Sequence, residues 1–102
     1  MIPGTTPTFT FTLPFDGSLL ASARISCLQE SPTEVLVVKE TADCLLDGDQ
    51  VSATLTQEES LRFTPGSPMR VQLRVLTTSG ESLATKPAMV SVGRCLDGEV
   101  LV

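Results

Sequence analysis

Histidine, tryptophan and tyrosine are all absent from this chain of 102 residues, and four phenylalanines supply all of its aromatic side chains. Without histidine, a serine or cysteine nucleophile lacks its commonest general base. With so few aromatic rings, the platforms on which bases and sugars stack are scarce. These absences argue against an enzyme and against a nucleic-acid-binding protein.

Positive charge is also in short supply, because seven Lys and Arg stand against twelve Asp and Glu, for a net charge of −5. Phosphate backbones repel such a chain, so we expect no nucleic-acid partner. No apolar run approaches the ~20 residues that a membrane span needs, so we expect no membrane partner either. Residues 1–7 lack the positive charge and the apolar core of a signal peptide, which predicts a protein made in the cytoplasm.

Cysteine is limited to Cys27, Cys44 and Cys95, an odd and widely spaced set without a Cys-x-x-Cys pair. A secreted β-sandwich usually carries an even set, so we expect free and mostly buried thiols. Oxidation of one pair in an extracellular particle stays open, and the sequence does not choose the pair. A fourth ligand at a spacing suitable for zinc is missing.

Strict alternation of apolar and polar side chains is the strongest pattern that the chain does contain. In residues 69–77 it is typical of a central strand with one buried and one exposed face. Residues 8–13 and 22–28 follow the same pattern. Residues 34–40 differ, because Val35 to Val38 are apolar on both faces. That strand is either covered on both sides or meets another subunit with its outer face.

Turn and helix signals separate these strands. Asp47-Gly48 lies between 44–46 and 49–55, which predicts a hairpin with both residues at the central positions of a type I′ turn. Thr56-Gln-Glu-Glu59 matches a capping box and predicts one helical turn that crosses from one sheet to the other. The usual hydrophobic staple is missing, since Ser60 stands where an apolar residue would face the chain before the helix.

The last third of the chain contains two short runs, 81–85 and 88–94, separated by Lys86-Pro87. Proline within a strand predicts an edge position or a kink. Further on, Asp97-Gly98 repeats the earlier Asp-Gly signal and predicts a second hairpin.

About seven short strands at spacings of roughly 8 to 14 residues predict an all-β fold, an immunoglobulin-like antiparallel β-sandwich with one short helical turn. Residues 8–95 are expected to form this single domain. Residues 1–7, rich in Pro, Gly and Thr, are expected to be an extended arm that is ordered against a neighbour. Residues 96–102 are expected to be a C-terminal hairpin or a tail that packs on another surface.

Carboxylates are the best candidate ligands for a metal. Asp47, Asp49 and Asp97, together with Asp43 and Glu99, could meet at one end of the sandwich, and oxygen donors suit calcium. However, the remaining ligands of a calcium loop are missing, and a hairpin turn explains the Asp-Gly-Asp sequence without metal. The sequence therefore predicts no cofactor and leaves Asp47, Asp49 and Asp97 as the metal candidates.

Six side chains are the candidates for protein contact: Leu36, Val38, Arg70, Arg74, Leu101 and Val102. The two leading residues belong to the apolar strand and the last two to the apolar tail. The two arginines form a basic stripe on the outer face of their strand. For them, ion pairs with Glu or Asp on a neighbouring strand are the favoured explanation, and an acidic partner subunit is the alternative.

Four stretches also carry a resemblance to known proteins: residues 1–15, 55–63, 71–80 and 92–96. They resemble the small immunoglobulin-like proteins of prophage structural gene clusters in Gram-positive gut bacteria. The middle and the end are similar in style to the β-sandwich that begins the baseplate upper proteins of siphophages. The resemblance rests on pattern over most of the chain.

The resemblance implies a tail, baseplate or other virion component that is made in the bacterial cytoplasm and has no catalytic residues. Its expected partners are other phage structural proteins, or further copies of the chain in a homo-oligomer. The absence of a fibre or coiled-coil segment argues against receptor binding. The alternative is a calcium- or glycan-binding adhesion module with an immunoglobulin-like fold, against which the missing Trp, Tyr and export signal argue.

Overall fold

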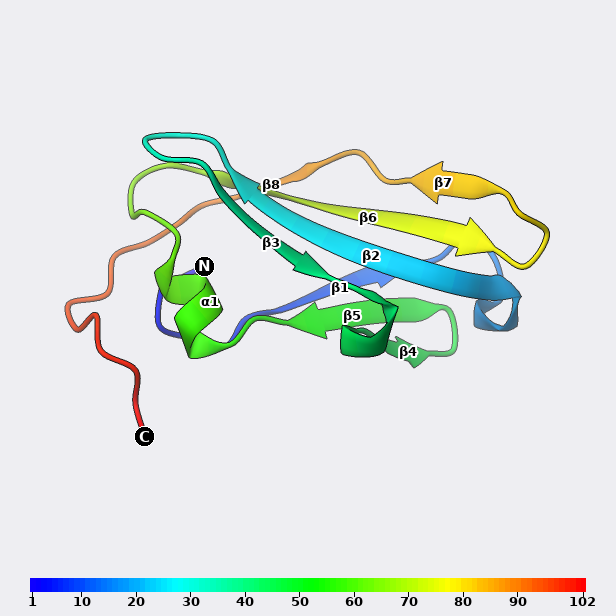
Figure 1. The fold of residues 1–102 in the computed structure, drawn as a ribbon, viewed down its shortest axis with the longest axis horizontal. Coiled ribbons are helices and arrows are strands. Elements are labelled where there is room, and N and C mark those ends of the chain that lie inside the picture. The colour runs from blue at the N-terminus through cyan, green and yellow to red at the C-terminus, as the bar shows by residue number, and fades with distance from the viewer.

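The computed structural model describes residues 1–102 as two antiparallel β-sheets packed face to face, so the predicted all-β sandwich is confirmed (Figure 1). The elements are β1 (Thr8–Thr12), η1 (Gly17–Leu19), β2 (Leu20–Gln29), β3 (Val35–Lys39), η2 (Thr41–Asp43), β4 (Leu45–Asp47), β5 (Gln50–Thr54), α1 (Gln57–Leu61), β6 (Met69–Thr77), β7 (Ser82–Ala84) and β8 (Ala88–Val90). The η elements are single 3-10 turns. There are eight strands, where about seven were expected.

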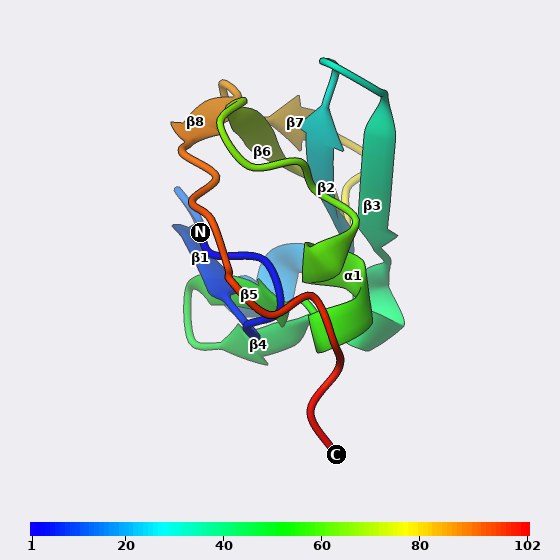
Figure 2. The ribbon, with the colours of Figure 1, turned by 90° about the vertical axis from the view of Figure 1, so that its left-hand side faces the viewer.

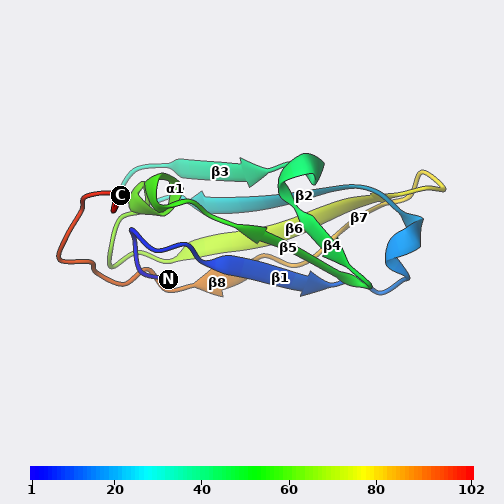
Figure 3. The same cartoon turned by 90° about the horizontal axis from the view of Figure 1, so that it is seen from below.

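The smaller sheet has the order β1-β5-β4, and the larger sheet has the order β3-β2-β6-β7, with β8 also paired to β6. Seen from below, the smaller sheet lies across the larger one (Figure 3). Immunoglobulin constant domains share such layers but place their second and third strands in different sheets. Here β2 and β3 pair within one sheet, so the strand order differs from that arrangement.

Strand β6 is central, as its alternation predicts. It pairs with β2 along one edge, while β7 and β8 share the other edge. Between β7 and β8 the Thr85 amide still donates to the Leu73 carbonyl at 2.9 Å, and Lys86-Pro87 then interrupts the ladder. The predicted edge position of this proline-containing segment is confirmed.

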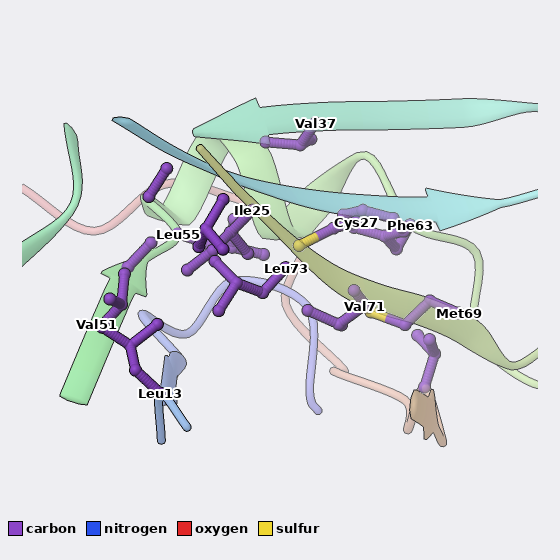
Figure 4. Packing of buried hydrophobic residues seen from close by; sticks show 14 residues of the cluster. Leu13, Ile25, Cys27, Val37, Val51, Leu55, Phe63, Met69, Val71 and Leu73 are labelled. Carbon is purple, nitrogen blue, oxygen red and sulfur yellow. The ribbon is translucent and has the colours of Figure 1, made fainter. Parts of the chain in front are cut away.

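Fourteen buried apolar residues from both sheets and their connections form one core (Figure 4). Val51 and Leu55 on the side of the smaller sheet point toward Ile25 and Leu73 of the larger one. Phe63, from the connection between α1 and β6, is the largest fully buried side chain. Each fully buried large apolar side chain stabilises the fold by roughly 1.5–3 kcal/mol. A polar side chain at the same inward position would lose this contribution and would also need a hydrogen-bond partner.

Helix α1 begins with the predicted capping box. The Glu59 amide donates to Thr56 Oγ1 at 3.1 Å, and the Thr56 amide donates to Glu59 Oε1 at 2.9 Å. The helix joins β5 of the smaller sheet to β6 of the larger one, as predicted. Ser60, at the position of the missing staple, is fully buried and serves another purpose. Its hydroxyl accepts from the Gly4 amide at 2.9 Å and donates to the Thr5 carbonyl at 2.7 Å.

The arm of residues 1–7 is therefore bound to its own domain, and its contact with a neighbour stays a prediction. The Met1 amino group donates to the Ser91 carbonyl at 2.6 Å, and the Gly93 amide donates to the Met1 carbonyl at 2.7 Å. The arm lies beside α1 and the C-terminal segment at one end of the molecule (Figure 2). Its backbone groups find partners within the chain, which is why it does not extend into solvent.

The first predicted hairpin forms, but its turn is shifted by one residue. Asp47 pairs with Gln50, so Gly48 and Asp49 are the two central residues. Gly48 has φ +61°, and no non-glycine residue has positive φ, which excludes a type I′ turn. The pattern fits type II′, in which the glycine comes first. This turn packs tightly on Gly17, where an added Cβ would lie 2.0 Å from the Gly48 carbonyl oxygen.

The second predicted hairpin, at Asp97-Gly98, does not form, because residues 91–102 contain no strand. The Glu99 amide donates to Asp97 Oδ1 at 2.9 Å, so the turn closes locally on a side chain. The backbone of Ser91 and Gly93 is already bonded to Met1 and cannot pair with the end of the chain. Residues 96–102 are a tail, the second of the two forms expected for this segment.

Candidate interaction surface

Strand β3 is an edge of the larger sheet and carries the longest apolar run of the edge strands, the four residues Val35 to Val38. Its only neighbour is β2. Val37 points inward and is buried, whereas Leu36 is 46% exposed and Val38 is half-buried. The outer face of β3 is thus not covered by any other part of the chain. Of the two explanations for this apolar run, coverage on both sides is wrong.

Leu28 on β2 enlarges this apolar surface. It pairs directly with Leu36, and the next outward pair along the strands is Ser26 with Val38. Directly opposite side chains on one face of a sheet lie close enough to touch, about 4.5–5.5 Å between Cβ atoms. We call Leu28, Leu36 and Val38 the edge patch. Leu28 is absent from the candidates that the sequence suggested, although the inward alternation of Ile25 and Cys27 places it on the outer face.

The other edges carry features that oppose pairing with a further strand. Strand β1 lies between Pro7 and Pro14, β4 is three residues long, and β7 is separated from β8 by Lys86-Pro87. Prolines and short strands are the usual means of blocking an open edge. Strand β3 has five residues without proline, like β1, but four of them form an unbroken apolar run, whereas β1 alternates Thr and Phe. The Leu36 carbonyl receives one long hydrogen bond, from Arg62 Nη2 at 3.4 Å.

Lys39 fixes the end of β3 by pointing inward to α1. Its ammonium group lies 2.6 Å from Glu59 Oε1, and the two side chains are 12% and 26% exposed. Burial by itself raises the pKa of the Glu59 carboxyl, but the hydrogen bonds from Lys39 and from the Thr56 amide outweigh it and hold that pKa below its ordinary value. The same carboxylate thus caps α1 and anchors the edge strand.

The two candidate arginines on β6 have different environments. Arg70 Nη1 lies 2.9 Å from Glu30 Oε1, so the predicted ion pair with a neighbouring strand segment is confirmed. Arg74 has no carboxylate within ion-pair distance, so the same prediction is wrong there. The residue directly opposite it on β2 is Arg24, which is paired with Glu40 at 3.0 Å. Both ion pairs are exposed, and each contributes ~0–1 kcal/mol to stability.

The tail contacts the body of the domain through its backbone. Gln57 on α1 accepts from the Leu101 amide at 2.7 Å and donates to the Leu101 carbonyl at 3.1 Å. The side chain of Leu101 is 71% exposed, and Val102 is fully exposed. The tail therefore rests on α1, but the apolar side chains that made it a contact candidate face solvent. No pattern in the sequence pointed to Gln57.

The metal candidates do not meet. Asp47 precedes the turn between β4 and β5 and Asp49 is one of its two central residues, whereas the tail that carries Asp97 lies at the opposite end of the molecule (Figure 1). No group of three or more carboxylate, thiol or imidazole side chains is arranged to hold a metal ion. The expected carboxylate cluster does not form because Asp97 lies in the tail and not in a second hairpin beside the first.

All three cysteines are free, with Cys27 buried and Cys44 and Cys95 partly buried, as predicted. Burial raises the pKa of the Cys27 thiol to about 11, and the Glu59 carboxylate adds to this effect. Burial also raises the pKa of Cys44, with further contributions from Asp43 and Glu40. Raised pKa values keep thiols protonated and unreactive, so these two cysteines are structural in character.

None of the helices has the length and apolar character needed to cross a membrane. Comparison of the chain with known protein families, with curated proteins and with solved structures finds no match.

Proposed function

We propose that this domain is a structural module, of the phage virion type that the sequence resembles, and that it joins a larger protein assembly through strand β3 and the edge patch. The partner contributes an extended apolar segment that pairs with β3. Its side chains then cover Leu36 and Val38. Main-chain hydrogen bonds supply affinity in such strand addition, and the apolar positions supply specificity.

The observation that carries this proposal is the contrast between β3 and the other edges. An open edge with consecutive apolar residues is a hazard, because it pairs with any strand that reaches it. The chain blocks its other edges by proline or by short length, yet leaves β3 open beside the exposed Leu36. A strand that functions as an attachment site would show this combination. We also propose that this domain is related to the immunoglobulin-like prophage proteins. It would share their two-layer arrangement but have the strand order described above.

The test compares Leu36→Lys with Leu45→Lys. Leu45 is the matched control because it also lies on an edge strand, β4, and is 68% exposed. Lysine on an edge strand opposes pairing without disturbing the core. The mass of each variant in solution is measured by light scattering over a range of concentrations. An oligomer of the unchanged chain that Leu36→Lys dissociates and Leu45→Lys preserves supports pairing between copies.

A monomeric chain moves the test to a second protein. The variants are then co-purified with the products of the genes adjacent to this one. Binding of a structural protein that is lost in Leu36→Lys and retained in Leu45→Lys supports the proposal. Equal binding by both variants, or no assembly with any of these proteins, refutes it.

A further inference from the structure

The outer face of the larger sheet contains a polar groove of about 220 Å³ beyond the edge patch. It lies over β2, β6 and β7, near the point where β3 ends. Six of its lining residues can form hydrogen bonds or carry charge: Ser22, Arg24, Glu40, Thr41, Arg74 and Ser82. The groove is part of the same surface as the edge patch, because Leu28 and Arg24 both point outward from β2.

The charges in this groove do not balance. Arg24 and Arg74 lie directly opposite each other in the ladder, and like charges in this position are unfavourable. Glu40 neutralises Arg24, whereas Arg74 has no ion-pair partner in the chain. The lining therefore carries one uncompensated positive charge, although the whole chain has a net charge of −5. The free Arg74 guanidinium, next to Arg24, can therefore bind an anion.

Two hydroxyl groups accompany the free guanidinium. Ser22 and Ser82 pair with Leu76 from its two sides, one row beyond the two arginines. Neither serine side chain is engaged in a hydrogen bond within the chain, so both are free to donate. Thr41 differs, because its hydroxyl already accepts from the Ala23 amide at 3.0 Å and donates to the Ala23 carbonyl at 3.1 Å.

We propose that this groove binds a carboxylate, with Arg74 as the principal ligand and Ser22 and Ser82 as additional donors. A guanidinium matches the two oxygens of a carboxylate through parallel hydrogen bonds. A singly charged group matches the single uncompensated charge, whereas a doubly charged oxyanion would leave an excess negative charge beside the Glu40 carboxylate. That the carboxylate belongs to an aspartate or glutamate side chain of a protein partner rests on the proposed function.

The binding of the carboxylate itself can be tested without the partner. Acetate is titrated into the isotope-labelled chain, and the guanidinium Nε–Hε resonances are followed by NMR, with sodium chloride as the ionic-strength control. We expect a saturable shift at Arg74 that chloride does not reproduce. Arg70 is the matched internal control, because it lies on the same face of the same strand but is occupied by Glu30.

Two variants sharpen the test. Arg74→Gln should weaken acetate binding, read at Arg24, by roughly tenfold or more, since a charge-assisted hydrogen bond is lost. Arg70→Gln should leave binding at Arg74 unchanged. Equal shifts at Arg70 and Arg74, or shifts that simply follow salt, overturn the proposal. Stronger binding of sulfate than of acetate overturns the assignment to a singly charged carboxylate.

The carboxylate site and the proposed structural role are tested by different measurements, so one can fail without the other. A chain that binds acetate at Arg74 but forms no assembly through β3 retains the carboxylate site and loses the structural role. A chain whose assembly depends on Leu36 but that shows no acetate binding retains the structural role and loses this site.

Discussion

The buried side chain of Gln29 allows a quantitative test of how the connection between α1 and β6 is held. Gln29 lies at the end of β2 and is fully buried. Its amide nitrogen donates to the carbonyl oxygens of Thr64 and Ser67, each at 2.9 Å. Its amide oxygen accepts from the Thr64 amide at 2.7 Å. The substitution Gln29→Leu keeps a side chain of similar volume and removes all three hydrogen bonds.

The expected loss of stability follows from these three bonds. A buried donor or acceptor left without a partner costs ~1–3 kcal/mol, and water that reaches the connection recovers part of that cost. We therefore expect the free energy of unfolding to fall by about 2–4 kcal/mol. A domain of this size has a total stability of about 5–15 kcal/mol, so the variant loses a large fraction of it.

Unfolding in urea, followed by far-ultraviolet circular dichroism, measures this loss, because a chain without Trp or Tyr lacks a useful fluorescent probe. The midpoint should fall by about 2 M with an unchanged slope, for a slope of about 1–1.5 kcal/mol/M. Gln72→Leu is the control, since Gln72 is half-buried and makes one side-chain hydrogen bond, to the Thr85 carbonyl at 2.7 Å. If Gln29→Leu loses no more stability than Gln72→Leu, the reasoning is refuted.

Three further predictions concern other contacts. Gly17→Ala should destabilise by about 1–3 kcal/mol in the same urea assay, because its Cβ would overlap the carbonyl of the β4–β5 turn, whereas Gly98→Ala, with no atom near its Cβ, should be neutral. The pKa of Glu59 is lowered from its ordinary value of 4.5 in the folded state. The contribution of Glu59 to the free energy of unfolding should therefore be fully present above pH 4.5 and be lost as the pH drops through the lower folded-state pKa. Lys39→Met should reduce this acid dependence and cost roughly 1–2 kcal/mol at neutral pH, and an unchanged acid transition would contradict the ion pair. Because burial raises the pKa of Cys27 to about 11, iodoacetamide at pH 8 should modify it only after unfolding, as mass spectrometry of the native and denatured chain would show.

Strands with one buried face could be predicted closely from the sequence. Residues 69–77 form β6 over the full predicted range, because alternation decides which face is buried and the core then fixes the strand. The turn after β4 was misplaced by one residue for a related reason. The pairing of Asp47 with Gln50 sets the turn, and that register depends on neighbouring strands more than on the Asp-Gly sequence itself.

The positions of the arm and the tail could not be predicted, since their contacts leave no periodic pattern. The Met1 amino group bonds to Ser91 across 90 positions, and Thr5 bonds to Ser60 across 55. The arm contributes only backbone groups to these two bonds, which any residue type provides, and the Ser60 hydroxyl on α1 that binds Thr5 belongs to no periodic pattern. Residues rich in Pro, Gly and Thr are therefore compatible with a free arm and with a bound one, and only the fold distinguishes the two.

In the candidate site, too, the sequence pattern predicts which face a side chain occupies, whereas the strand register decides which residues lie next to it. Alternation correctly placed Arg70 and Arg74 on the outer face of β6, but it could not distinguish between them. The register with β2 brings Glu30 beside Arg70 and places Arg24 opposite Arg74, so one arginine is neutralised and the other is left free. An exposed ion pair contributes only ~0–1 kcal/mol, so the fold does not depend on a partner at either position. The unpaired Arg74 guanidinium is therefore available to a ligand.

The exposed apolar residue Leu36 on β3 also has an environment that the sequence alone could not predict. The run of apolar residues in this strand had two explanations, and the absence of any cover over Leu36 removes one of them. Stability alone would be served as well by a polar residue at this outward position, as Ser26 and Gln72 show on the neighbouring strands. The exposed Leu36 and the free Arg74 thus lie on the same outer face of the larger sheet. A partner that covers both would account for their presence with a single interaction.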